Sequence, residues 1–176
     1  MIAVDEALGC RSTVQEKLAW VQARWPGMAF EAAGLVLHLA RTRDLLFARS
    51  RSVLDVQGLA PAEFEALLNL LKQPEPHQLT PGAIASAIGL SSGGMTKALN
   101  KLVERGLISR AISPADRRSR LVRLTPEGIA LAEATLQTII QRHGTIMADI
   151  LSAEERQQLT ALLEKLLGSL ESAESR

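Results

Sequence analysis

The sequence predicts a mostly helical α+β fold, and three observations lead to this prediction. Aromatic residues make up only 3% of the 176-residue chain while Ala and Leu are abundant, a composition that favours helix. Apolar residues recur at helical spacing through most of the chain, and two short segments within residues 107–124 alternate in polarity as strands do. Apolar residues make up 47% of the chain, which indicates a globular protein with a hydrophobic core.

The first 78 residues are predicted to form helices. Thr13 and Glu16 are spaced as a capping box before a first helix, which a Pro-Gly pair ends. A long helix is expected over about residues 30–56, and Pro61 is suited to the first position of a third helix. Residues 73–78 contain two prolines and are expected to form a loop.

Shorter elements follow from Leu79. Thr80 and Ser91 are suited to cap two short helices, separated by a turn at Gly89. The second helix ends at Gly106, after which two strands are expected to form a hairpin. Helix, turn, helix and hairpin in this order predict a winged helix-turn-helix.

The C-terminal part is predicted to form two more helices, the first capped by Thr125 and the second opened by a capping box of Ser152 and Glu155. The first carries the apolar residues Ile129, Leu136, Ile140 and Met147. The second carries an apolar stripe that includes Leu159, Leu162, Leu163 and Leu166. These helices either pack on each other within one chain or bury their leucines against a second copy, and we interpret the stripe as a dimer interface.

The predicted organisation therefore has three parts. Residues 1–78 hold N-terminal helices for dimerisation and part of an effector pocket. Residues 79–124 hold the winged helix-turn-helix, and residues 125–176 hold the C-terminal dimerisation helices.

Charge is unevenly distributed along the chain. Residues 79–124 contain eight Lys and Arg against two acids, a net +6, whereas the remaining residues contain twelve against seventeen, a net −5. A basic module within an acidic frame is typical of a protein that binds a polyanion. The alternative is a solvated surface that happens to be basic.

The second short helix has the pattern of a helix that lies in the major groove. Its buried face is expected to contain Met95, Leu99 and Leu102. Its opposite face presents small, hydrogen-bonding and cationic residues, namely Gly93, Thr96, Lys97, Asn100 and Lys101. Gly93 and Gly94 near the start allow the helix N-terminus to approach phosphate, and the alternative is a loose cap.

Four arginines lie close together in the segment "SPADRRSRLVRLTPEG", residues 113–128, at and beside the tip of the predicted hairpin. They are Arg117, Arg118, Arg120 and Arg123. A hairpin beside a helix in the major groove can insert an arginine into the neighbouring minor groove, where the potential is most negative. Asp116 is placed to orient Arg118. The alternative is a solvated basic hairpin.

The segments "LTPGAIASAIGLSSGGMTKALNKLVERGLISR" and "SPADRRSRLVRLTPEG" resemble the MarR family of transcriptional regulators. The resemblance extends over roughly residues 35–170 and implies an obligate homodimer on a pseudo-palindromic operator. It places Ser92, Thr96 and Lys97 in the major groove, and Arg118, supported by Asp116, in the minor groove. The residues predicted to bind DNA are Ser91, Ser92, Gly93, Thr96, Lys97, Asn100, Lys101, Arg110, Asp116, Arg117, Arg118 and Arg120.

The family often responds to a small ligand or to cysteine oxidation. The single cysteine, Cys10, precedes the first expected helix and the chain has no Tyr, so thiol sensing is not expected. A urate-sensing branch has features matched by Trp20 and Glu65, but Ala98 stands where that branch has an arginine. The candidate ligand residues are Trp20, His38 and Glu65, with core packing as the alternative for Trp20 and His38.

Other function classes lack support. No cluster has metal-ligand spacing, no catalytic motif is present, and no apolar run is long enough to span a membrane. We therefore expect a cytoplasmic protein without enzymatic activity, metal or cofactor. The sequence predicts a repressor that binds double-stranded DNA. Binding of a small-molecule effector is expected to release the repressor from the DNA. The alternatives are a winged-helix protein-interaction module and an architectural DNA binder without an effector.

Overall fold

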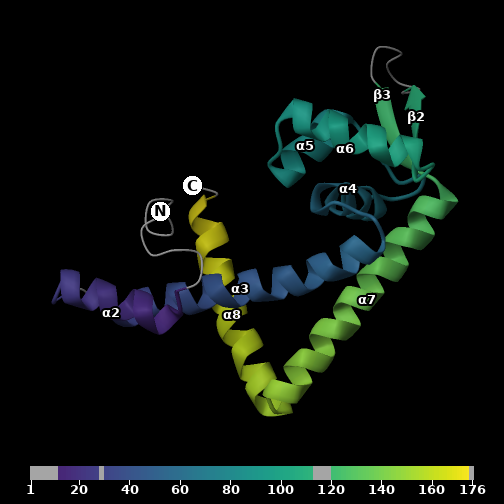
Figure 1. The fold of residues 1–176 in the computed structure, drawn as a ribbon. Coiled ribbons are helices and arrows are strands. Elements are labelled where there is room, and N and C mark those ends of the chain that lie inside the picture. Colours follow the sequence, from purple (N-terminus) through teal and green to yellow (C-terminus); the bar gives the residue numbers. More distant parts are fainter. Residues whose placement is uncertain (1–11, 28–29, 113–119, 175–176) are drawn as a thin grey trace. The chain divides into compact units, whose positions relative to one another are not determined.

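The computed structural model describes residues 12–27, 30–112 and 120–174, and it is mainly helical with one small sheet, as the sequence predicts (Figure 1). The chain divides into two compact units, Met1–Ser52 and Val53–Arg176, called units 1 and 2 below. The long helix α3 (Phe30–Val56) runs through the boundary between them. Within the described segments, no helix has both the length and the apolar character that crossing a bilayer requires.

Unit 1 contains α2 (Val14–Arg24) and most of α3. The predicted capping box is confirmed, because the Thr13 Oγ1 accepts from the Glu16 amide at 3.2 Å and the Glu16 carboxylate accepts from the Thr13 amide at 2.7 Å. The rings of Trp20 and Trp25 meet edge to face, with 5.5 Å between their centroids. No residue of α2 is fully buried, and its apolar residues Val14, Leu18 and Val21 are partly buried.

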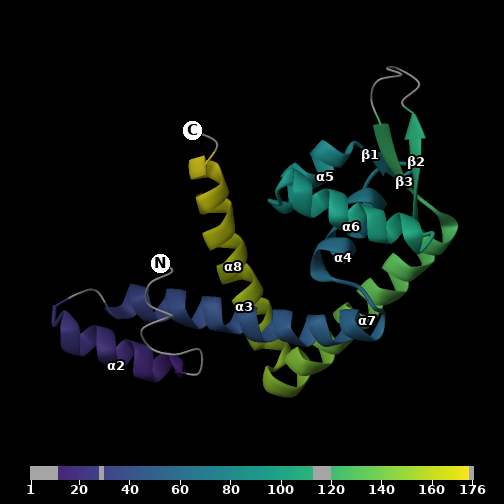
Figure 2. The ribbon, with the colours of Figure 1, turned by 45° about the horizontal axis from the view of Figure 1, so that its top comes forward.

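Unit 2 begins with the last residues of α3, and α4 (Pro61–Leu71) follows. Helix α4 lies beneath the two short helices α5 (Pro81–Ile88) and α6 (Ser92–Glu104) (Figure 2). Side chains from all three helices share one hydrophobic core. Its fully buried members are Leu67, Leu70, Ile84, Met95 and Leu102. Burying side chains of this size stabilises a fold by about 1.5–3 kcal/mol each.

The sheet of unit 2 contains the predicted hairpin and one short additional strand. Strand β3 (Arg120–Leu124) lies between β1 (Gln78–Leu79) and β2 (Ile108–Ile112), and both pairings are antiparallel. Ile108 pairs with Leu124, and Arg110 pairs with Val122. Strand β1 was not predicted, because two residues are too few to show a strand pattern.

Helix α7 (Pro126–Ile150) starts against the base of the hairpin. Thr125 caps it by accepting from the Gly128 amide at 3.0 Å, and its hydroxyl donates to the Gly106 carbonyl at 2.7 Å. The buried residues of α7 are Gly128, Ala132, Thr135 and Ile139. Of the large apolar residues that the sequence shows on this helix, Ile140 is 59% exposed. Small residues allow α7 to approach its neighbours closely, and a search for large apolar residues overlooks them.

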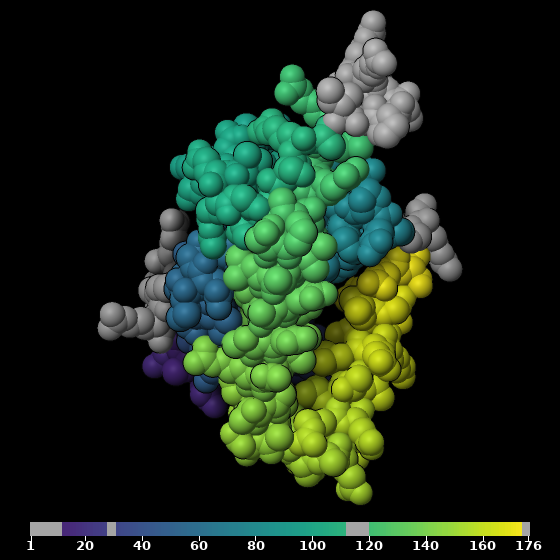
Figure 3. All heavy atoms as spheres, turned by 90° about the vertical axis from the view of Figure 1, so that its right-hand side faces the viewer, coloured from purple at the N-terminus to yellow at the C-terminus, as the bar shows by residue number. Residues whose placement is uncertain are grey.

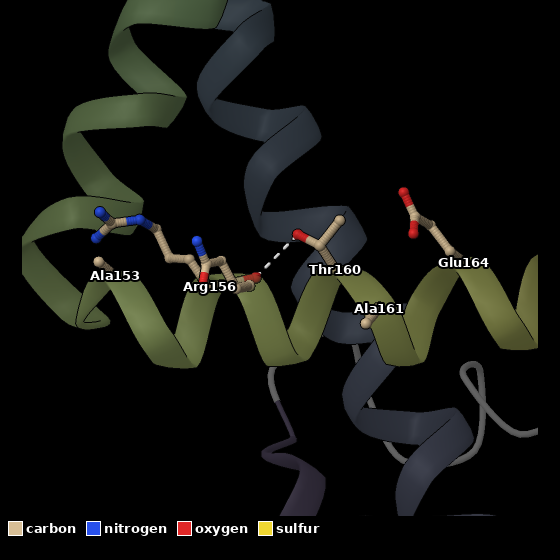
Figure 4. Close-up of a pocket in the computed structure, with 6 residues that line it drawn as sticks. Ala153, Arg156, Thr160, Ala161 and Glu164 are labelled. Atoms are coloured by element: carbon tan, nitrogen blue, oxygen red, sulfur yellow. Dashed lines mark hydrogen bonds between the residues drawn. The ribbon is translucent and has the colours of Figure 1, made fainter.

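Helix α8 (Ala153–Glu174) follows α7 after a sharp turn (Figure 3). Ser152 and Glu155 form the predicted capping box, and the hydrogen bonds from the Ser152 backbone and side chain lower the pKa of Glu155. A shallow furrow runs along one face of α8 (Figure 4), lined by Ala153, Arg156, Gln157, Thr160, Ala161 and Glu164. The leucine stripe of α8 is exposed in the single chain, and at 100° per residue it lies on another side of the helix from the furrow.

We predict that Gly128→Ala destabilises unit 2 by about 1–3 kcal/mol, because a Cβ at this position collides with the Leu107 carbonyl, a backbone atom that side-chain rotation cannot move. Urea unfolding followed by circular dichroism measures the change. Gly93→Ala is the matched control, since the space around that Cβ is open and the variant should be at least as stable as the wild type. Equal stability of the two variants would contradict the close approach.

Candidate nucleic-acid interface

The candidate recognition helix is α6. The left-handed conformation of Gly89, at φ 72°, ends α5, and Ser91 caps α6 by accepting from the Gly94 amide at 3.3 Å. As predicted, Met95, Leu99 and Leu102 are buried, and Ala98 is buried with them. The opposite face of the helix is exposed and presents Ser92, Gly93, Thr96, Lys97 and Asn100. These residues offer hydroxyl, amide and ammonium groups without bulky apolar side chains.

The hydroxyl of Thr96 is oriented by its own helix. It donates to the Ser92 carbonyl at 2.8 Å, which leaves its oxygen free to accept and its methyl group on the exposed face. An acceptor beside a methyl group can contact the amino group of adenine or cytosine and the methyl group of thymine. Thr96 is therefore ordered for contact with base edges.

Asn100 links the recognition helix to the hairpin. Its Oδ1 accepts from an Nη of Arg110 on β2 at 2.6 Å. The Arg110 side chain is exposed, so its other donors remain at the surface next to α6. The pair holds one predicted DNA-binding arginine in a defined position.

The hairpin arginines are used in different ways. Arg123 donates two hydrogen bonds to the side-chain oxygen of Gln78, at 3.0 and 3.3 Å, and so joins β3 to β1. Arg120 is exposed at the start of β3. Asp116, Arg117 and Arg118 lie outside the described residues, and their roles remain predictions.

Lys101 was predicted to bind DNA, but it pairs with a buried acid. Its Nζ lies 3.6 Å from the Oε1 of Glu63, whose side chain is only 4% exposed. The other carboxylate oxygen of Glu63 accepts from the Ala60 amide at 2.9 Å and so caps α4. The role of Glu63 was not predicted, although an acid two residues after Pro61 at a helix start is a signal for such a cap.

An acid limits the length of the interface along α6. Glu104 is exposed and lies on the same side of the helix as Lys97 and Asn100, given 100° per residue. A carboxylate near the C-terminus of α6 repels phosphate. The geometry therefore favours contact through the first two and a half turns of the helix.

Known proteins match this chain over most of its length. Residues 57–119 match the model of the MarR family. A transcriptional regulatory protein for the hcr operon of Thauera aromatica is 31% identical over 77% of this chain and 80% of its own length. The chain belongs to the MarR family of transcriptional regulators. The regulator PecS of Dickeya dadantii is 27% identical, over 80% of this chain and 84% of its own.

One solved structure with the fold of this MarR-family chain contains DNA. A Staphylococcus aureus MepR variant, bound to an oligodeoxyribonucleotide, superposes with a TM-score of 0.56 at 27% identity. The match covers 76% of this chain and 96% of that one. The predicted winged helix-turn-helix and family are thereby confirmed.

The candidate ligand residues of this MarR-family chain lie on separate elements. Trp20 on α2 and His38 on α3 belong to unit 1, whereas Glu65 on α4 belongs to unit 2. Trp20 is 39% exposed, and His38 is also exposed, with its Nδ1 2.7 Å from the Gly34 carbonyl. The interpretation of these two as core residues is therefore wrong for the single chain. Among the described residues, no group of His, Cys, Asp or Glu is placed to hold a metal ion.

We predict that Gly93→Ala weakens DNA binding without lowering stability. Glycine within a helix costs about 1 kcal/mol relative to alanine. A Cβ added at position 93 would meet open space, so no contact among the described residues requires a glycine there. A close approach of DNA would explain why this position lacks a side chain, and a loose cap is the alternative. Fluorescence anisotropy with a duplex selected by the wild-type protein measures the loss, and thermal unfolding serves as the control. Unchanged affinity would show that DNA does not approach Gly93.

Proposed function

We propose that this chain is a sequence-specific DNA-binding repressor that acts as a homodimer on a pseudo-palindromic operator. The observation that carries the proposal is the exposed face of α6, where Thr96, Lys97 and Asn100 are presented beside the anchored Arg110. The DNA-bound MepR relative supports it. The proposal assigns no enzymatic activity and places the protein in the cytoplasm, where a regulator meets the chromosome.

The proposed roles follow from position. Thr96 and Lys97 read base edges in the major groove, with Ser91, Ser92 and Gly93 at the helix start near phosphate. Arg110 contacts the backbone, and Arg120 supports the wing in the minor groove together with Arg117 and Arg118. Residues 79–124 would form the DNA module, while residues 1–78 and 125–176 would form the dimerisation parts.

The homodimer is supported by the leucine stripe of α8. The four predicted interface leucines, Leu159, Leu162, Leu163 and Leu166, are 39–66% exposed in the single chain. A contiguous row of exposed leucines on a helix of 22 residues is costly in water. A second copy would cover the same stripe by two-fold symmetry and place two recognition helices about 34 Å apart on one face of the DNA.

The effector part of the proposal concerns unit 1. Trp20 and Trp25 form an exposed aromatic pair, and the cationic end of Arg24 lies 5.7 Å from the Trp25 ring centroid. Such a surface suits a flat, anionic small molecule. Because these are the two Trp residues of a chain without Tyr, intrinsic fluorescence reports on this site directly. If no member of a panel of small aromatic acids quenched the Trp fluorescence or released the protein from bound duplex, the proposed effector site would be contradicted.

We predict that DNA binding depends strongly on salt. With about four phosphate contacts from each of two modules, the slope of log K against log salt should be roughly −7. Anisotropy titrations of a labelled duplex at several salt concentrations measure it. A slope near zero would favour the protein-interaction module instead, and equal affinity for all duplexes would favour an architectural binder.

We predict that Leu163→Asp disrupts the dimer, because it places a charge within an apolar interface at a cost of several kcal/mol. Light scattering coupled to size-exclusion chromatography should show a dimer for the wild type and a monomer for the variant. Tight binding to a palindromic duplex should be lost, while weak non-specific binding by the basic module remains. A variant that stays a stable dimer would refute the assigned interface.

A further inference from the structure

We propose that Lys101 and Arg105 are positioning residues, which fix the recognition helix α6 on the corner between α3 and α4 and do not contact DNA. The corner comprises residues 57–63, all within unit 2. This inference rests on the proposed function, because it distinguishes cations of the basic module that bind other parts of the protein from cations that bind DNA.

Arg105 binds the first half of the corner. Its Nη1 donates to the Gly58 carbonyl at 2.7 Å and its Nη2 donates to the Gln57 carbonyl at 3.0 Å. Both carbonyls lie directly after the C-terminus of α3, where the helix dipole carries partial negative charge. A guanidinium with two charge-assisted hydrogen bonds to the same segment is held in position as well as in orientation.

Lys101 binds the second half of the corner through Glu63. The Glu63 carboxylate is nearly buried and already caps α4 through the Ala60 amide, so it is fixed in place. Lys101 and Arg105 are four residues apart and therefore lie on the same face of α6. The two cations meet neighbouring parts of one corner, as the position of α4 beneath α6 allows (Figure 2).

The corner itself is rigid enough to serve as a support. Gly58 adopts a left-handed conformation at φ 61°, and the Leu59 amide donates to the Leu54 carbonyl at 2.9 Å, which closes the end of α3. Leu54 and Leu59 are each only 3% exposed. The left-handed glycine and the Leu59-to-Leu54 hydrogen bond form a Schellman motif, a common way to end a helix. A recognition helix attached to it has little freedom to shift.

Salt dependence separates a positioning cation from a cation at the DNA. Removing a cation that displaces counterions reduces the slope of log K against log salt by about 0.9 per contact, so by about 1.8 for a dimer. Removing a positioning cation lowers affinity and leaves the slope unchanged. An affinity loss between about twofold and about thirtyfold is expected from a coupling residue of this kind.

The experiment compares Lys101→Met and Arg105→Met with Lys97→Met, a matched control on the exposed face of the same helix. The probe is the duplex that the wild-type chain selects from a random library. We expect Lys97→Met to reduce the slope, and the other two variants to lose affinity at the wild-type slope. A reduced slope for Lys101→Met or Arg105→Met equal to that of Lys97→Met would overturn the proposal.

A second readout does not depend on DNA. Glu63→Gln keeps an oxygen that can cap α4 but removes the charge, so Lys101→Met should change the urea midpoint far less in the Glu63→Gln background than alone. This double variant also avoids leaving a buried carboxylate unpaired, which protects the test against loss of folding. Additive effects would overturn the pairing. A wild-type chain that binds no duplex would overturn the proposed function, while the unfolding cycle would still decide the pairing.

Discussion

The division of α6 into a buried and an exposed face is the constraint on which the rest of the structure depends. Met95, Leu99 and Leu102 are committed to the core that α4 and α5 complete. Their burial fixes the rotation of the helix and leaves Thr96, Lys97 and their neighbours at the surface. A helix rotated by half a turn would bury a lysine and expose three large apolar residues, which is strongly unfavourable. The binding face is thus a consequence of core packing.

Hydroxyl groups set where the elements around α6 begin. Thr80, Ser91 and Thr125 each cap a helix through the amide three residues later. Thr125 has a further role, because its hydroxyl also binds the Gly106 carbonyl at the end of the turn that follows α6. Gly128 then allows α7 to approach the Leu107 carbonyl. The hairpin is therefore held between the recognition helix and α7 by local contacts that tolerate little change.

The sequence predicts the elements well, because caps, glycine turns and apolar spacing are local signals. It predicts the partners of charged residues poorly. Lys101 and Arg105 read as parts of one basic surface, and only the fold shows that residues 57–63 lie within their reach. The buried face of α7 was hard to predict for the same reason. Gly128 and Ala132 are buried by elements that pack against them, and the local sequence does not show that packing. His38 has apolar neighbours in the sequence, yet its side chain is exposed.

The most direct test of the account is the accessibility of α6 with and without DNA. Single cysteines would be placed by Ser92→Cys and Glu104→Cys in a Cys10→Ser background, about 18 Å apart along the helix axis. The rate of maleimide alkylation would then be measured with and without a saturating selected duplex. The account predicts strong protection by DNA at position 92 and little protection at position 104. Protection at 104 without protection at 92, or at neither position while the duplex is bound, would contradict it.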